Sequence, residues 1–116
     1  MPEADIQSLD QARRRQNPIM DTKARAALEK LIDLAKTKSG QGRRVADFLL
    51  AWWDAKENGG FDLTDMWGLD DDICPLMVEV FRLISTTEKY PDTLGYADDF
   101  DFIWQIWRGE RSDVEE

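Results

Sequence analysis

Apolar residues recur along the chain at the spacing of helices, and the first such pattern follows Asp21. Its members fall in the i, i+3, i+4, i+7, i+8, i+11 series: Ala24, Ala27, Leu28, Leu31, Ile32 and Ala35. Asp21 is well placed to cap this helix, because an aspartate side chain accepts hydrogen bonds from the free backbone N–H groups of the first turn. Gly40 and Gly42 are expected to end the helix.

The next pattern predicts a second helix, over about residues 43–58. Gly59 and Gly60 stop it, because glycine readily takes the left-handed conformation that closes a helix. Its apolar face is expected to comprise Val45, Phe48, Leu49 and Trp52, with Trp53 at the edge. The stretch 61–69 predicts one short helical turn that lies over the core.

Two further helices are expected in the C-terminal part. The third begins at the run Asp70–Asp72, with Asp71 or Asp72 as its cap, because Pro75 is tolerated only in a first turn. The fourth spans about residues 97–108. Their expected core faces are Ile73, Leu76, Met77, Val80, Phe81 and Ile84 in the third helix, and Phe100, Ile103, Trp104 and Trp107 in the fourth. Because the sequence sustains no period-two alternation, the predicted fold class is all-α: a small bundle of four helices plus one short extra helical turn.

These patterns divide the chain into three parts. Residues 1–20 are expected to form a flexible N-terminal tail, because only Ile6, Leu9 and Ala12 keep helical spacing there. Residues 21–109 form the predicted helical domain, and residues 110–116 a charged C-terminal tail.

Charge is distributed unevenly along the chain. Up to Arg44 there are ten Lys and Arg against six Asp and Glu, whereas the remainder has five against eighteen, within a total of −9. Negative charge repels phosphate, so no direct binding of nucleic acid is expected there. It favours a protein partner with a basic surface. The basic segment comprises Arg13, Arg14, Arg15, Arg43 and Arg44.

Arg43 and Arg44 lie in the first turn of the second predicted helix, the end of the dipole that disfavours positive charge. We favour a solvated linker as the explanation. A contact with an acidic surface, either of this protein or of a partner, is the alternative.

The acidic residues supply the main candidates for partner binding. They are expected to form one carboxylate-rich face: Asp54, Asp70, Asp71, Asp72, Glu79, Asp98, Asp99 and Asp101. A purely local explanation competes with this one, because both Asp clusters fall at predicted helix starts, where aspartate is favoured in any protein.

The five tryptophans divide into two groups. Trp52, Trp104 and Trp107 share faces with the apolar patterns and are expected in the core. Trp53, at the edge of its face, and Trp67, in a short connector, are the aromatic candidates for partner contacts, since tryptophan is enriched at binding hot spots.

The composition argues against catalysis. The sequence has no histidine, which removes the commonest general base and metal ligand, and Cys74 is its single cysteine. No metal or cofactor motif is present, so we expect a protein that is not an enzyme and binds no cofactor. A secretory signal and an apolar run of about 20 residues are also missing from the sequence, which favours a soluble, cytoplasmic protein that does not contact a membrane.

Five blocks of the sequence resemble a known family. They are 44–54 (RVADFLLAWWD), 58–62 (NGGFD), 67–72 (WGLDDD), 90–96 (YPDTLGY) and 103–108 (IWQIWR). Over residues 43–108 the chain resembles small uncharacterised proteins encoded on plasmids and integrative mobile elements of proteobacteria. The resemblance implies a mobile-element setting and supplies no catalytic residues. In size and charge the chain is also similar to anti-CRISPR proteins, some of which present carboxylates in place of phosphates.

Two functions remain open at this point. The first is a binding inhibitor of the anti-CRISPR type, which docks its carboxylate-rich face on a basic nucleic-acid-binding surface of a CRISPR effector or another nucleic-acid-handling complex. The second is a structural or adaptor module of the mobile element, as a monomer or a self-associating homodimer.

Overall fold

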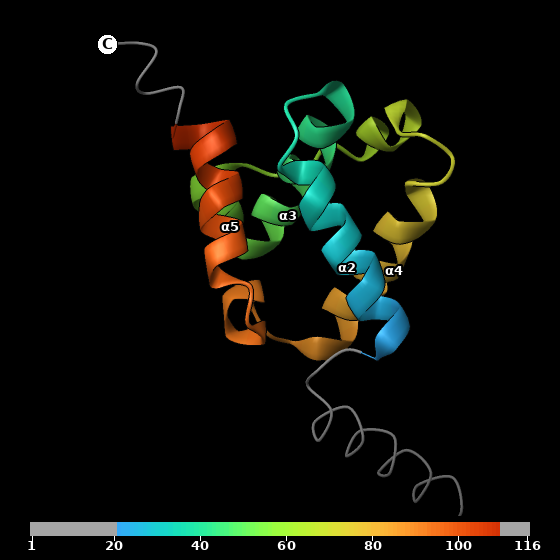
Figure 1. Cartoon of the computed structure of the whole chain (residues 1–116), viewed down its shortest axis with the longest axis vertical. Helices are drawn as coiled ribbons and strands as arrows, with labels where there is room; N and C mark the ends of the chain where they lie inside the picture. The colour runs from blue at the N-terminus through green and yellow to red at the C-terminus, as the bar shows by residue number, and fades with distance from the viewer. Residues whose placement is uncertain (1–20, 110–116) are drawn as a thin grey trace, which may run out of the picture.

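The computed structural model describes residues 21–109, and every regular element in this range is helical (Figure 1). The four α-helices are α2 (Thr22–Ala35), α3 (Gly40–Asn58), α4 (Cys74–Thr87) and α5 (Ala97–Trp104). Two short 3₁₀ helices, η1 (Leu63–Gly68) and η2 (Pro91–Leu94), connect them, and α5 continues into a π-helical turn, η3 (Gln105–Gly109). The all-α prediction is confirmed, and the described helices agree with a four-helix bundle. The predicted tails, including Arg13, Arg14 and Arg15, lie outside the described residues.

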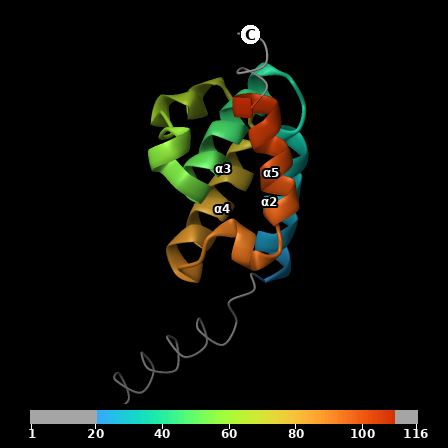
Figure 2. The same cartoon turned by 90° about the vertical axis from the view of Figure 1, so that its left-hand side faces the viewer.

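Helix α2 is the central element of the bundle. It packs against α3 and α4, while α5 packs against α3 and α2 (Figures 1 and 2). All four α-helices contribute to one continuous core. Its largest fully buried apolar side chains include Leu28, Leu31, Leu49, Leu50, Met77, Val80, Phe100 and Ile103.

The junction between α2 and α3 differs from the prediction. Helix α2 ends at Ala35, and Gly40 and Gly42 belong to the first turn of α3. The backbone N–H of Gly42 donates to the Ser39 hydroxyl (2.9 Å), so Ser39 caps α3. Glycine is needed at position 42 because a Cβ atom would meet the Thr37 carbonyl oxygen and lie 2.7 Å from that of Leu34. Gly42 therefore permits close packing of two helix ends.

The start of α4 also differs from the prediction. Neither Asp71 nor Asp72 caps the helix, which begins at Cys74 after Ile73. The backbone carbonyl of Asp70 accepts from the N–H groups of Ile73 (3.0 Å) and Cys74 (3.2 Å) and so opens the helix without a side-chain cap.

The core side of α4 is rotated relative to the predicted face. Met77, Val80 and Leu83 are buried, although the prediction omitted Leu83. Phe81, which was expected in the core, is exposed. The prediction was wrong here because six apolar positions cover more of the helix circumference than the neighbouring helices do.

Helix α3 ends where the two glycines predicted it, after a kink at Asp54. Asp54 has extended backbone angles (φ −164°, ψ 88°), which interrupt the helical ladder. The Asn58 amide spans the break by donating to the Leu50 carbonyl (3.1 Å). Gly59 follows at φ 92°, a conformation that other residues rarely adopt.

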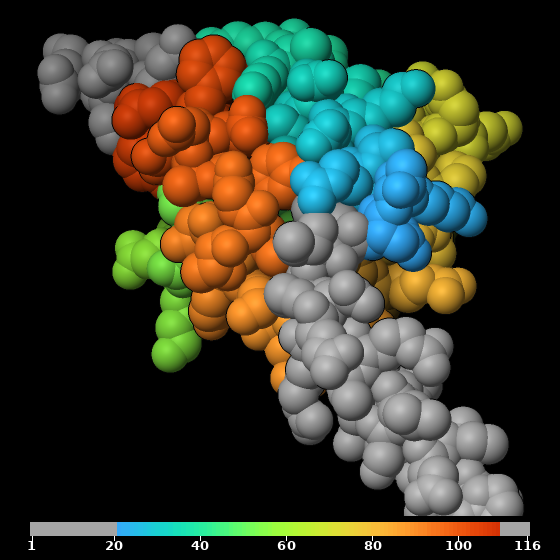
Figure 3. All heavy atoms as spheres, turned by 60° about the horizontal axis from the view of Figure 1, so that its bottom comes forward, coloured from blue at the N-terminus to red at the C-terminus, as the bar shows by residue number. Residues whose placement is uncertain are grey.

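The start of α5 is tied to α2 through Tyr96. Its hydroxyl donates to Glu29 (2.9 Å) and accepts from Arg25 (3.4 Å), and the two segments lie in contact in Figure 3 (orange and light blue). Burial raises the pKa of the Tyr96 phenol, and the hydrogen bond to the Glu29 carboxylate raises this pKa further. In η3, which follows α5, the Trp107 indole N–H donates to the Ala35 carbonyl (2.6 Å).

Candidate binding surface

The predicted carboxylate-rich face is divided in the structure. The turn of residues 70–72 lies at the upper right of Figure 1, whereas the start of α5, which carries Asp98, Asp99 and Asp101, lies at the lower left, with α2 between them. The two helix starts that carry the Asp clusters therefore lie apart in this view.

Two of the predicted acidic residues form ion pairs with lysines of the same chain. Lys36 forms an ion pair with Asp99 (2.7 Å), and Lys23 forms a longer one with Glu79 (3.8 Å). These pairs lie at the surface, so each contributes little to stability. They nevertheless reduce the negative charge that Asp99 and Glu79 offer to a partner.

Arg43 and Arg44 are held by acidic residues of the same chain. Arg43 pairs with Asp47 (2.8 Å) and Asp65 (3.7 Å), and Arg44 lies 3.8 Å from Asp65. The solvated linker favoured from the sequence is therefore wrong for the two arginines, and the alternative, an acidic surface of this protein, is what the structure contains.

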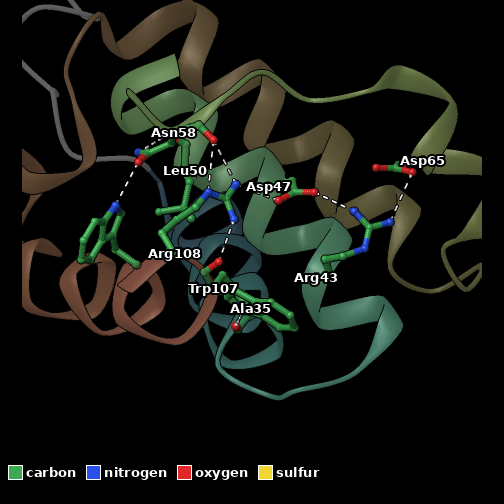
Figure 4. A network of polar contacts seen from close by, with 9 residues as sticks. Ala35, Arg43, Asp47, Leu50, Asn58, Asp65, Trp107 and Arg108 are labelled. Carbon is green, nitrogen blue, oxygen red and sulfur yellow. Dashed lines mark hydrogen bonds and ion pairs between the residues drawn. The ribbon is translucent and has the colours of Figure 1, made fainter. Parts of the chain in front are cut away.

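A polar network continues from Arg43 to the C-terminal end of the described chain (Figure 4). Asp47 accepts from both Arg43 and Arg108 (2.9 Å). Arg108 also donates to the backbone carbonyl of Asn58 (3.1 and 3.2 Å), and the Asn58 amide oxygen accepts from the Trp104 indole (3.1 Å). The network joins η3 to α3, which indicates a structural role for these charges.

The tryptophans differ in part from their predicted locations. Trp104 was expected in the core but is exposed, and its indole N–H donates to the Asn58 side chain at the end of α3 (3.1 Å). Trp52 and Trp107 are partly buried. Trp67 is strongly exposed, and Trp53 is partly buried with its ring in edge-on contact with Phe100 (centroids 5.8 Å apart).

An apolar groove with a volume of about 400 Å³ lies between α3, η1 and α4. Three large apolar side chains along it are exposed: Leu63 (75%), Val78 (58%) and Phe81 (63%). The groove is further lined by Phe48, Ala51, Trp52, Phe61, Met66, Met77 and Ile84. Sequence reasoning missed this site, because Phe48, Phe81 and Ile84 matched the pattern of core positions.

A second cleft, of about 620 Å³, adjoins the groove and shares Ala51 and Trp52 with it. Its lining is more polar and combines aromatic rings with charged groups. The remaining lining residues are Trp53, Asp54, Ala55, Lys56, Tyr90 and Asp92. The indole N–H of Trp52 donates to the Lys89 carbonyl (3.1 Å), which holds the segment before Tyr90 against α3.

Other kinds of site find little support within residues 21–109. No group of three or more acidic or Cys side chains in this range is arranged to hold a metal ion. The thiol of Cys74 donates weakly to the Met66 carbonyl (3.5 Å), as expected of a packed structural cysteine. None of the helices between these residues has the length and apolar character needed to span a bilayer.

The fold and the groove define a small helical protein with an apolar surface that residues 21–109 leave open. The chain belongs to a family described as "Family of unknown function (DUF7673)", whose model matches residues 25–108. The match includes most of α2, the groove and the second cleft. Comparisons with curated proteins and with solved structures give no match.

Proposed function

We propose that this protein is a non-enzymatic binding protein whose groove between α3, η1 and α4 receives apolar side chains of a protein partner. The supporting observation is the exposure of Leu63, Val78 and Phe81 along one hollow. Large apolar residues are common on surfaces singly, but their gathering around a groove is typical of binding sites.

The exposed area is large enough for a useful affinity. A phenylalanine buries roughly 150–250 Å² when it is fully covered. Phe81 is 63% exposed, so a partner could cover a further ~100–150 Å². At about 25 cal/mol per Å² this area corresponds to roughly 3 kcal/mol, or about a hundredfold in affinity.

Phe102 provides a matched control for Phe81. It is a phenylalanine of similar exposure (53%), but it lies on α5, where Lys36 sits 5.5 Å from its ring, and it does not line the groove. A photo-cross-linking phenylalanine analogue can therefore be placed at position 81 or at position 102 of the full chain and activated in bacterial cells.

We expect a defined covalent adduct from position 81 and none from position 102. A Leu63→Ser substitution should reduce the adduct at 81, because it removes a second apolar contact from the same groove. Adducts of equal yield from both positions would contradict the proposal, as would no adduct at 81. Sedimentation of the purified chain distinguishes a foreign partner from a second copy of this protein.

A second candidate function is inhibition of a nucleic-acid-handling complex, such as a CRISPR effector in the bacterial cytoplasm, by a protein encoded on a mobile element. Asp98 and Asp101 support it, because both are exposed and neither has an ion pair with a residue in the range 21–109. Carboxylates of this kind can occupy a basic surface in place of phosphates.

Salt and charge removal separate the two candidates. Inhibition through carboxylates should weaken steeply at high salt and in an Asp98→Asn/Asp101→Asn variant, because steering by surface charge is screened. Capture through the groove should persist in that variant and fall with Leu63→Ser. An adaptor module that joins copies of itself would instead raise the sedimenting mass with protein concentration.

A further inference from the structure

We propose that the groove's partner presents an arginine beside its apolar side chains, and that the cleft lined by Trp53, Asp54, Tyr90 and Asp92 takes the guanidinium. This inference rests on the proposed function for the groove and specifies the chemistry of the partner. It concerns a surface that sequence reasoning identified only in part, through Trp53 and Asp54.

The cleft and the groove adjoin. Ala51 and Trp52 line both hollows, so a segment seated against Trp52 in the groove is within reach of the cleft. The groove lining is almost entirely apolar, whereas two carboxylates and an ammonium group line the cleft. A segment that fits both therefore needs apolar side chains followed by a polar, charged one.

Both walls of the cleft are held in place by local structure. On the α3 side, the kink at Asp54 turns the helix, and the Asp54 carboxylate accepts from the Glu57 N–H (3.3 Å). On the other side, the hydrogen bond from Trp52 to the Lys89 carbonyl fixes the segment that carries Tyr90 and Asp92. Carboxylates and rings from segments more than 30 residues apart in the sequence are thus presented together.

This lining suits a cation. Aromatic faces attract cations through the ring quadrupole, and carboxylates complement positive charge. Arginine fits better than lysine, because its planar guanidinium stacks on an aromatic ring and donates to a carboxylate with the same group. The whole range of residues 21–109 has 17 Asp and Glu against 11 Lys and Arg, and this excess of negative charge favours a basic partner segment.

Lys56 is the one cation among the residues that line the cleft. Its ammonium group reduces the attraction for a second positive charge. Replacing it with glutamine should therefore strengthen binding of a guanidinium, which is an effect that a purely apolar surface would not produce.

The inference can be tested without knowing the partner. The ¹⁵N-labelled full chain is titrated with Nα-acetyl-arginine amide, and separately with Nα-acetyl-citrulline amide, which has a similar shape and no charge. We expect the arginine compound to shift the Trp53 indole and Tyr90 backbone signals, and the citrulline compound to leave them unchanged. Lys56→Gln should increase the shifts at equal concentration of the arginine compound.

Asp54→Asn/Asp92→Asn is the decisive variant, since asparagine at position 54 can still accept from the Glu57 N–H while the charge is lost. The shifts should largely disappear in it. They should persist in Asp98→Asn/Asp101→Asn, which removes the same charge from a site outside the cleft. The inference is overturned if the first variant keeps the shifts, if the second loses them equally, or if citrulline matches arginine.

Failure here is distinguishable from failure of the groove proposal. The titration contains no partner protein, so a negative result removes the arginine site and leaves capture by the groove standing. Absence of a cross-link at position 81 contradicts capture by the groove whatever the titration gives.

Discussion

The Asn58 amide should be one of the most important polar groups for the stability of this fold. Asn58 is only 9% exposed, and its side chain donates to the Leu50 carbonyl (3.1 Å) and accepts from the Trp104 indole (3.1 Å). Asn58→Ala removes both bonds but keeps the backbone carbonyl that Arg108 contacts. The substitution therefore isolates the contribution of the amide.

The expected cost follows from what the substitution leaves unpaired. Removing a hydrogen-bond partner from a buried polar group costs about 1–3 kcal/mol, and this applies to the carbonyl of the fully buried Leu50, which loses the Asn58 amide donor. The Trp104 indole is partly exposed, so water can replace part of its bond and the loss there is about 1 kcal/mol. The free energy of unfolding should fall by roughly 2–4 kcal/mol, a large share of the 5–15 kcal/mol typical of a small domain.

Urea unfolding of the full chain, followed by circular dichroism at a helix band, measures this change. Glu57→Ala is the matched control, because Glu57 is an exposed neighbour in the same turn and should change stability by less than about 0.5 kcal/mol. A double-mutant cycle with Trp104→Phe should return a coupling of about 1 kcal/mol for the indole bond. If Asn58→Ala matches Glu57→Ala, the bonds that span the kink in α3 do not stabilise the fold and the reasoning is refuted.

Two further predictions concern the helix junctions. Gly42→Ala should destabilise the protein by about 1–3 kcal/mol, because the new Cβ would meet backbone oxygens that cannot move easily. Gly40→Ala should be close to neutral, because the atom nearest to a Cβ there is at the end of the flexible Arg44 side chain (3.3 Å). Thermal unfolding of the two variants compares them. Tyr96→Phe should cost about 1–2 kcal/mol at pH 7, where the phenol donates to a carboxylate. Because the pKa of Tyr96 is raised above its ordinary 10.0, the folded chain retains a proton that the unfolded chain loses, so wild-type stability falls as the pH rises above 10. Unfolding measured at intervals above pH 9 should therefore show the difference between wild type and Tyr96→Phe shrinking, and a constant difference would contradict this account.

The helices could be predicted from the sequence because the spacing of apolar residues depends directly on local backbone structure. Asp21 caps α2 as predicted, with its carboxylate accepting from the Ala24 N–H (2.8 Å), and α3 ends at the predicted glycines. The helix starts were predicted less well. Ser39, which is three residues before the buried Gly42, and the Asp70 carbonyl make the bonds that the sequence reasoning assigned elsewhere.

The candidate binding surface was much harder to predict. Periodicity indicates that α4 has an apolar face, but it does not indicate how much of that face the other helices cover, so Phe81 looked like Val80. Ion pairs are equally non-local: Arg108 and Asp47 are 61 positions apart, and their pairing depends on how η3 returns to α3. The grouping of the acidic residues depends on the same non-local packing.

The exposed carboxylates and the exposed apolar residues differ in what their exposure to water costs. Aspartates such as Asp98 and Asp101 are hydrated at no cost and keep a small protein soluble, so their presence requires no partner. Leu63, Val78 and Phe81 have the opposite property, because the apolar area that they expose to water adds nothing to folding. Polar replacements there would leave the fold almost as stable and the protein more soluble. Three large apolar side chains gathered around one hollow are more typical of a binding site than carboxylates are, and for this reason our proposal favours the groove over the carboxylate clusters.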